Sequence, residues 1–353
     1  MKRILLLIAI VAIALVMETS CTDAPALVMA TSCTDEPGKH TVTLNANDGT
    51  GNAISQIFTK GTAQKLTKNS FTVSTGRSKF LGWNTDKEAT IATITDEANY
   101  TATANVTLYA IWGYEIGDRG PAGGFIFYDV DADNNDGKNG GRGLDNLTSL
   151  TTVASGDMPA NWKYLEAAPY DIKVDGDNIS LATTAGGGSD IPFSYYRTTE
   201  NGNNLFTDGT QTPEAFPQIK PFVGQGANNT KLIVQARGDK GYTQKAGSDT
   251  TKHYAAKVCD ELKVTHNENE FKDWFLPSHI ELIRLSKSEA FENCHIGSEF
   301  PNEGRYISST EIGIDKNVIN VSSVKYNNYY SSWNYFVTSS SDAYKVRAIR
   351  AVK

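Results

Sequence analysis

The first apolar segment of the chain is short and follows a cationic start. Lys2 and Arg3 precede residues 4–17, which carry no charge and are almost wholly apolar, and small residues then lead to Cys21. A membrane-spanning helix needs about 20 apolar residues, whereas a secretory signal places an apolar core of about 7–15 residues between a charged start and small residues. Residues 1–20 are therefore predicted to form an export signal.

Apolar and polar residues alternate strictly in the next patterned segment. In residues 41–46, Val42, Leu44 and Ala46 fall on one face, which is the period of a half-buried strand. The polar stretch 47–52 contains Asn-Asp-Gly and predicts a turn. Further strand-like stretches lie at 58–66, 80–85 and 106–112. Together these segments predict a small β domain.

The rest of the chain mixes the periods of helix and strand. A helix is predicted at 254–262, whose apolar residues share one face, and another at 279–286, where Ser278 and Glu281 have the spacing of a capping box. Strands are predicted at 125–128, 306–311 and 344–350. The expected fold class is mainly β and α+β.

Length and composition agree with this division and exclude one class of partner. With 353 residues, two or three domains are expected, and apolar and charged contents of 39% and 21% are those of a globular protein. The formal net charge is −7 and no extended basic segment is present. Nucleic acid is therefore not an expected partner, because phosphates are neutralised by clustered Lys and Arg.

Twelve residues are duplicated at the junction behind the export signal. ALVMETSCTDAP at 14–25 is followed directly by ALVMATSCTDEP at 26–37, so that Cys21 recurs as Cys33. Thr-Ser-Cys behind an apolar core resembles the lipobox of bacterial lipoproteins, in which the cysteine becomes lipidated. The resemblance implies a chain anchored to the cell envelope, outer membrane or cell surface, by acyl chains, with residues 21–39 as a tether.

The two copies compete for this role. Glu18 occupies a lipobox place that is usually apolar, which counts against Cys21. The second copy has a better tetrapeptide, but Asp23 and Pro25 interrupt the apolar run before Cys33. Position favours Cys21, and Cys33 is the alternative.

The β domain carries motifs of a known family. VTLNANDGTG, FLGWNT and NVTLYAIW resemble the Listeria–Bacteroides repeat, the internalin-type B repeat, across residues 40–113. The resemblance implies a compact β-grasp-like module of the kind found in surface proteins as a spacer or interaction module. Trp83 and Trp112 suggest either stacking on sugar rings or core packing; we predict core packing, because a small domain depends on its few large rings.

The C-terminal two thirds resembles a second family. IGDRGPAGGFIFYD, WKYLEAAP, GQGANNT, DWFLPSHIEL, YISSTE and YKVRAIR occur in the order found in the C-terminal domain family of the Legionella collagen-like protein, over residues 114–353. The resemblance implies a C-type-lectin-like α+β domain, similar to surface adhesins of which some bind sulfated polysaccharides, and it supplies no enzymatic residues. Arg347 and Arg350 suggest either sulfate binding or decoration of the last strand.

An acidic stretch suggests a calcium site. Alternating acids present oxygen ligands on one side of a loop, as Ca²⁺ requires. The candidate ligands are Asp129, Asp131, Asp133, Asn135 and Asp136. The stretch is not an EF-hand, because Asn134 replaces the glycine of the loop, and an acidic surface loop without any ion remains the alternative.

Two cysteines follow the duplicated segment. In an exported protein, Cys259 and Cys294 are predicted to form a disulfide, with buried free thiols as the alternative.

The densest mixture of aromatic and polar residues lies at 327–336. Tyr and Trp beside Asn suit contact with glycans or proteins, although a strand pair with core rings is the alternative. The candidate ligand-binding residues are Tyr329, Tyr330, Trp333, Asn334 and Tyr335.

These patterns together predict an exported, lipid-anchored surface protein that binds a polysaccharide or a protein ligand, as an adhesin would. A structural envelope protein without a discrete ligand is the main alternative. An enzyme on a lectin-like scaffold is less favoured, because the sequence offers no convergent set of titratable groups.

Overall fold

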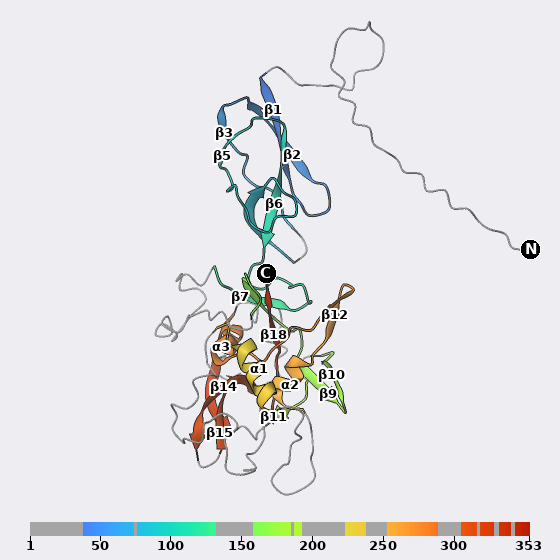
Figure 1. Ribbon diagram of the computed structural model, residues 1–353, viewed down its shortest axis with the longest axis vertical. Helices are drawn as coiled ribbons and strands as arrows, with labels where there is room; N and C mark the ends of the chain where they lie inside the picture. Colours follow the sequence, from blue (N-terminus) through green and yellow to red (C-terminus); the bar gives the residue numbers. More distant parts are fainter. Residues whose placement is uncertain are drawn as a thin grey trace, which may run out of the picture.

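The computed structural model describes residues 38–73, 76–131, 158–184, 187–192, 223–237, 253–288, 305–315, 318–327, 332–339 and 343–353. Figure 1 shows the first six strands at one end of the molecule and the later elements at the other. We call these regions the N-terminal module (described residues 38–113) and the C-terminal body (described residues from 114 onward). The described part of the chain is mainly strand, as the sequence predicts.

The N-terminal module is built on one mixed sheet and one small ribbon. The sheet has the strand order β2-β1-β6-β4, in which β1 and β6 are parallel and the other pairs are antiparallel. The ribbon pairs β3 with β5. The strands are β1 (Lys39–Asn45), β2 (Ala53–Thr59), β3 (Ala63–Lys65), β4 (Lys79–Asn84), β5 (Asn99–Thr101) and β6 (Val106–Gly113).

The core of the module follows from the alternation in β1. Val42 and Leu44 are buried, as predicted, and pack with Phe58, Trp83 and Trp112. The Nε1 of Trp112 donates a hydrogen bond of 2.8 Å to the carbonyl oxygen of Ala46, so that the ring also anchors the end of β1. The prediction that both tryptophans are core residues is confirmed.

Two sheets of three strands form the frame of the C-terminal body. The first has the order β18-β8-β7 and joins the last strand of the chain to two early ones. The second is antiparallel with the order β14-β15-β16. Their strands are β7 (Phe125–Asp129), β8 (Tyr164–Ala167), β14 (Arg305–Asp315), β15 (Val318–Asn327), β16 (Ser332–Ser339) and β18 (Ile349–Val352).

Three short ribbons and three helices complete the body. The ribbons pair β9 (Ile172–Asp175) with β10 (Asn178–Leu181), β11 (Ile191–Pro192) with β17 (Ala343–Tyr344), and β12 (Val264–His266) with β13 (Asn269–Phe271). The helices are α1 (Gly226–Arg237), α2 (Ala255–Asp260) and α3 (His279–Lys287). Within the described residues, no helix is both long and apolar enough to cross a membrane.

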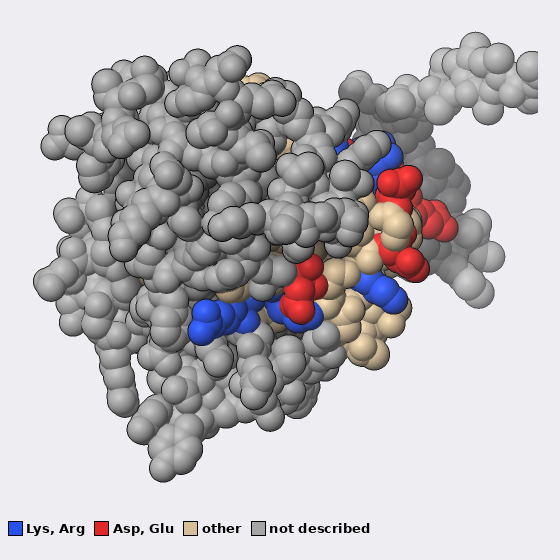
Figure 2. Space-filling model, turned by 90° about the horizontal axis from the view of Figure 1, so that it is seen from below, with Lys and Arg blue, Asp and Glu red and all other residues tan. Residues whose placement is uncertain are grey.

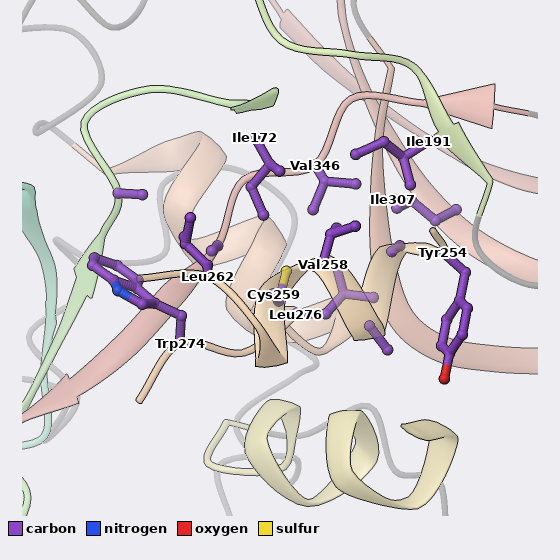
Figure 3. Close-up of a cluster of buried hydrophobic side chains, with 14 of the residues drawn as sticks. Ile172, Ile191, Tyr254, Val258, Cys259, Leu262, Trp274, Leu276, Ile307 and Val346 are labelled. Atoms are coloured by element: carbon purple, nitrogen blue, oxygen red, sulfur yellow. The ribbon is translucent and has the colours of Figure 1, made fainter. Parts of the chain in front are cut away.

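The helices agree with the sequence in part. Ser278 caps α3 and forms the predicted capping box with Glu281. α2 buries Val258 and Cys259 in a core that also contains Trp274 (Figure 3). The strand predicted at 344–350 is divided into β17 and β18, and α1 was not predicted.

Module and body are joined by polar and cation–π contacts. The Nζ of Lys79 lies 2.9 Å from the Oδ2 of Asp129, which is buried at the end of β7. The hydroxyl of Ser78 donates to Asp118 across the same junction. The guanidinium of Arg77 lies over the ring of Tyr114, 5.1 Å from the ring centroid. The two regions are therefore held together directly beside the chain that links them.

Candidate functional site

The C-terminal body contains buried charged groups that tie its motifs together, and Glu166 is the first. This residue of β8 is buried, and its carboxylate accepts hydrogen bonds from the amides of Ala122 and Gly124, at 3.0 and 2.8 Å. The guanidinium of Arg350 donates to the same carboxylate at 2.9 Å. Burial raises the pKa of Glu166, and these three donors oppose that shift.

The glycine-rich turn before β7 is shaped around this carboxylate. A side chain at Gly120 would meet the Glu166 side chain, so only glycine fits there. The amide of Gly120 donates to the carbonyl of Gly124, and that of Gly123 to the carbonyl of Gly120. The segment 117–124 thus forms a tight turn that places the amides of Ala122 and Gly124 on Glu166.

Arg350 links β18 to a second carboxylate. Its Nε and Nη2 each lie 2.9 Å from an oxygen of Asp273, which is a bidentate pair. The guanidinium also lies over the ring of Phe271, 4.7 Å from the centroid. Arg350 is therefore engaged inside the body, and a sulfate ligand would have to displace Glu166 and Asp273.

A second buried ion pair joins Arg347 and Asp171. The Nε of Arg347 lies 2.7 Å from Asp171 Oδ1, and its Nη1 donates to the carbonyl of Ala168. The hydroxyl of Tyr306 donates to Asp171 Oδ2 at 2.9 Å. The attraction of Asp171 raises the pKa of Arg347 in spite of burial, which lowers it. Arg347 is accordingly an internal residue and does not decorate the surface.

The third buried charge, Glu281, lies where two helices begin. Its carboxylate accepts from the amide of Ser278, at the start of α3, and from that of Gly224, at the start of α1, at 2.6 and 2.7 Å. The amide of Gly226 is a further donor, and a side chain at Gly226 would meet the carboxylate. One residue thus caps two helices, where negative charge is favoured by both helix dipoles. Burial raises the pKa of Glu281 to about 7.

Hydroxyl and amide groups continue this polar region into β14. The Nδ2 of Asn229 donates to the hydroxyl of Ser309 at 3.1 Å, and the hydroxyl of Thr310 accepts from the amide of His279 at 2.9 Å. Burial lowers the pKa of His279 to about 4. The motifs GQGANNT, DWFLPSHIEL and YISSTE thus meet in one region, where their polar atoms bind one another. Their arrangement orders the backbone of three elements.

The predicted ligand-binding residues lie on or beside the outer strand β16. Tyr329 and Tyr330 fall outside the described residues. The register pairs Trp333 with Tyr326, Asn334 with Lys325, and Tyr335 with Val324.

The register across the second sheet relates this stretch to the other two strands. Val324, the partner of Tyr335, pairs with Tyr306 of β14, and Lys325, the partner of Asn334, pairs with Arg305. The ligand-binding role of the set stays a prediction.

Two of the predicted calcium ligands have cationic neighbours. Asp129 pairs with Lys79, and Asp131 lies 3.4 Å from the Nζ of Lys163. The remaining candidates, Asp133, Asn135 and Asp136, fall outside the described residues. Within the described ranges, no cluster of three or more His, Cys, Asp or Glu side chains could hold a metal ion. The calcium site stays a prediction.

The cysteines are partly described. Cys259 is buried in the apolar core, where burial raises the pKa of its thiol well above the usual value (Figure 3). Cys294, its predicted disulfide partner, lies outside the described residues, so the bridge stays a prediction. Both lipidation candidates, Cys21 and Cys33, also lie outside them.

Comparison with known proteins bears on the N-terminal module. No curated protein and no solved structure matches the chain. Residues 40–111 match a family of repeat domains, and the matched segment runs from β1 into β6. These bounds agree closely with the module predicted at 40–113, and the chain therefore carries a Listeria-Bacteroides repeat domain at residues 40–111.

Proposed function

We propose that this chain is an exported, lipid-anchored surface protein that binds glycans, in the manner of an adhesin. The Listeria-Bacteroides repeat at 40–111, directly behind an export-type N-terminus, carries the proposal. In this arrangement Cys21 is the lipidated residue, with Cys33 as the alternative. The tether then holds the module and the body away from the membrane.

The topology of the module supports a β-grasp-like assignment. Its two central strands, β1 and β6, are the first and last of the module and run parallel, with antiparallel neighbours on both sides. Sheets of this order pack one face on a core. The module serves as a spacer and as an interaction domain.

For the C-terminal body we propose a lectin-like domain related to the C-terminal domain of the Legionella collagen-like protein. The contacts of Glu166, Glu281 and Asp171 support this proposal. These buried carboxylates bind other motif residues inside the body, so the motifs serve to maintain the fold. The register aligns two cationic residues and an amide residue across the second sheet, namely Arg305, Lys325 and Asn334. Residues of these kinds suit the sulfate or carboxylate groups of an acidic polysaccharide.

The full-length protein offers two direct tests. Mass spectrometry of the mature N-terminus should find acyl groups on Cys21, and acyl groups on Cys33 would transfer the anchor to the second copy. Accessibility of the body to protease on intact cells should show that it is displayed outside. An unprocessed N-terminus would overturn the proposed export.

Glycan binding is tested by an array of neutral and sulfated polysaccharides, with calcium or with a chelator. We expect a sulfated polysaccharide to bind, and Lys325→Glu to weaken it while sparing neutral glycans. The binding should fall at high salt, because screening weakens charge attraction. An absence of binding to every polysaccharide would favour the structural envelope role.

A further inference from the structure

The N-terminal module contains a pocket beside the end of its central strand. The pocket has a volume of about 360 Å³ and lies between residues 47–48 and residues 87–90, over residues 110–112 of β6. The pairing of β6 with β1 ends at Tyr109, so the last part of β6 extends past β1. We call this feature the loop pocket.

Its lining combines a small apolar floor with a polar rim. The floor consists of Val73, Ala110, Ile111 and Trp112. The rim carries the charged residues Asp48, Arg77, Lys87 and Glu88, together with Asn47, Ala89 and Thr90. Trp112 keeps 9% of its surface exposed while the rest of the ring is packed in the core. The rim therefore provides most of the polar contacts available to a ligand.

The walls are held in place by bonds within the protein. The side-chain Nδ2 of Asn47 donates to the backbone carbonyls of Lys87 and Ala110, at 3.0 and 3.1 Å, and so ties both loops to β6. Asp48 accepts from the amide and hydroxyl of Thr50, at 2.9 and 2.6 Å. Because these bonds already order the loops, a ligand would lose little affinity to loop ordering.

We propose that the loop pocket binds one neutral saccharide unit. This inference extends the proposed glycan binding to the repeat module, and it rests on that function. The rim contains two carboxylates, of Asp48 and Glu88, and two cationic groups, of Arg77 and Lys87, so its formal charges cancel. Because these charges cancel, the rim favours neither an acidic nor a basic ligand.

A saccharide can use both kinds of rim group at once. A hydroxyl donates to a carboxylate and accepts from a cation, and a sugar carries several hydroxyls around a weakly apolar ring face. The carbon-bound hydrogens of that face suit the floor formed by Ile111 and the edge of Trp112. The volume lies near the lower end of the range for small-molecule sites, which fits a single sugar unit.

The test uses the full-length protein and isothermal titration with glucose, galactose, mannose, N-acetylglucosamine and their β-linked dimers. Glucuronic acid and acetylated dipeptides are the competing probes. Glu88→Ala removes an acceptor, and Thr90→Trp fills the mouth of the pocket. Glu270→Ala is the matched control, since Glu270 is also a surface carboxylate paired with a nearby lysine, Lys272. Thr59→Trp is the control for added bulk, at an exposed position of β2.

We expect at least one neutral saccharide to bind, with a dissociation constant that rises about tenfold in Glu88→Ala, because a hydrogen bond to a charged group is lost. Binding should be lost in Thr90→Trp and unchanged in both controls. Circular dichroism will report whether Thr90→Trp folds. If it does not fold, the affinity of Glu88→Ala alone tests whether the saccharide binds in the loop pocket.

Three outcomes would overturn the inference. Saccharide binding that survives both pocket variants would place the site elsewhere and leave the proposed function intact. Binding of dipeptides alone would assign the loop pocket to a peptide ligand. If no saccharide of the panel binds, the loop pocket is not a sugar site. The proposed function is then still tested separately, by protease accessibility on intact cells and by the polysaccharide array.

Discussion

The two regions of this molecule are stabilised in different ways. The described core of the N-terminal module is apolar and contains the large rings of Trp83, Trp112 and Phe58. The C-terminal body also has apolar cores, but it buries Glu166, Glu281 and further charged residues among them. All the charged side chains that are buried within the described ranges lie in the body.

This difference follows from the architecture of each region. The module is a sheet whose strands bond one another, so apolar packing on one face suffices to fix it. The body brings together short strands, turns and helix starts, whose backbone amides lack partners in a ladder. Buried carboxylates supply those partners, as Glu166 does for the turn at residues 120–124 and Glu281 for two helices.

The largest expected effect comes from the core of the module. Trp83→Ala removes a fully buried ring and should lower the free energy of unfolding of the module by about 3–5 kcal/mol. Chemical denaturation followed by circular dichroism of the backbone, rather than by tryptophan fluorescence, will measure this loss. Ile91→Ala is the control, because its side chain is 66% exposed, and it should cost less than about 0.5 kcal/mol. Equal losses in both variants would contradict an apolar core as the basis of the module.

The body should lose more stability when one partner of a buried ion pair is removed than when both partners are replaced by neutral residues. Arg347→Met leaves Asp171 buried with only Tyr306 as a side-chain donor and should cost about 3 kcal/mol. The double variant Arg347→Met with Asp171→Asn should recover part of this loss, because no uncompensated charge remains. Urea denaturation of the single and double variants will compare them. A double variant less stable than Arg347→Met would show that Asp171 stabilises the body even without Arg347, so that an uncompensated charge is not the cause of the loss.

Stability of the body should depend on pH through Glu281. Its pKa in the folded state, about 7, is above the ordinary value of 4.5, so folding favours the protonated form. The contribution is fully present below pH 4.5, falls as the pH rises, and is lost above about pH 7. Its size is at most about 3 kcal/mol.

The difference between wild type and Glu281→Gln isolates this effect. His279 contributes in the opposite direction, because its lowered pKa, about 4, makes the body less stable as the pH falls below 6.5. Both proteins contain His279, so its effect cancels in the difference. In urea denaturation from pH 4 to pH 8, the stability of the wild type relative to Glu281→Gln should fall as the pH rises. A difference that does not change with pH would mean that folding leaves the pKa of Glu281 at its ordinary value.

The smallest effect is expected at the junction of the two regions. Lys79→Ala removes a half-exposed partner from the buried Asp129 and should cost about 1 kcal/mol. Lys65→Ala is the control within the module, because Lys65 and Glu97 form an exposed pair, and its effect should be close to zero. Differential scanning calorimetry should show the melting of module and body separating in Lys79→Ala alone. A single unchanged transition would indicate that the other contacts hold the junction.

Local patterns predicted the elements that depend on local interactions. The alternation around Val42 and Leu44 identified β1, and the spacing of Ser278 and Glu281 identified the start of α3. The start of α1 carries no acidic residue, and its polar beginning, GANNT, looks like a loop. Its amides are instead capped by Glu281, which lies 57 residues further along the chain from Gly224. A capping residue so far away in the sequence cannot be predicted by a rule that considers only neighbouring residues.

The candidate site was less predictable for the same reason. Arg347 and Arg350 have the pattern of residues on a surface strand. Arg350 meets Glu166 because β18 pairs with β8, and Arg347 meets Asp171 just beyond the ends of these two strands. The sequence identifies the aromatic stretch at 327–336, but its pairing with β15 depends on the register of the folded sheet. The loop pocket combines two turns and the end of β6, which only the folded sheet brings together.

The position of β18 has a consequence for the order of folding. The ion pair of Arg350 with Glu166 closes a chain segment of 184 residues, and that of Arg347 with Asp171 one of 176 residues. The N-terminal module closes on itself within residues 39–113. A nascent chain therefore completes the module early, while the body waits for residues 349–352 to emerge. Until then Glu166 and Asp171 lack their counter-charges, which keeps the body open during synthesis.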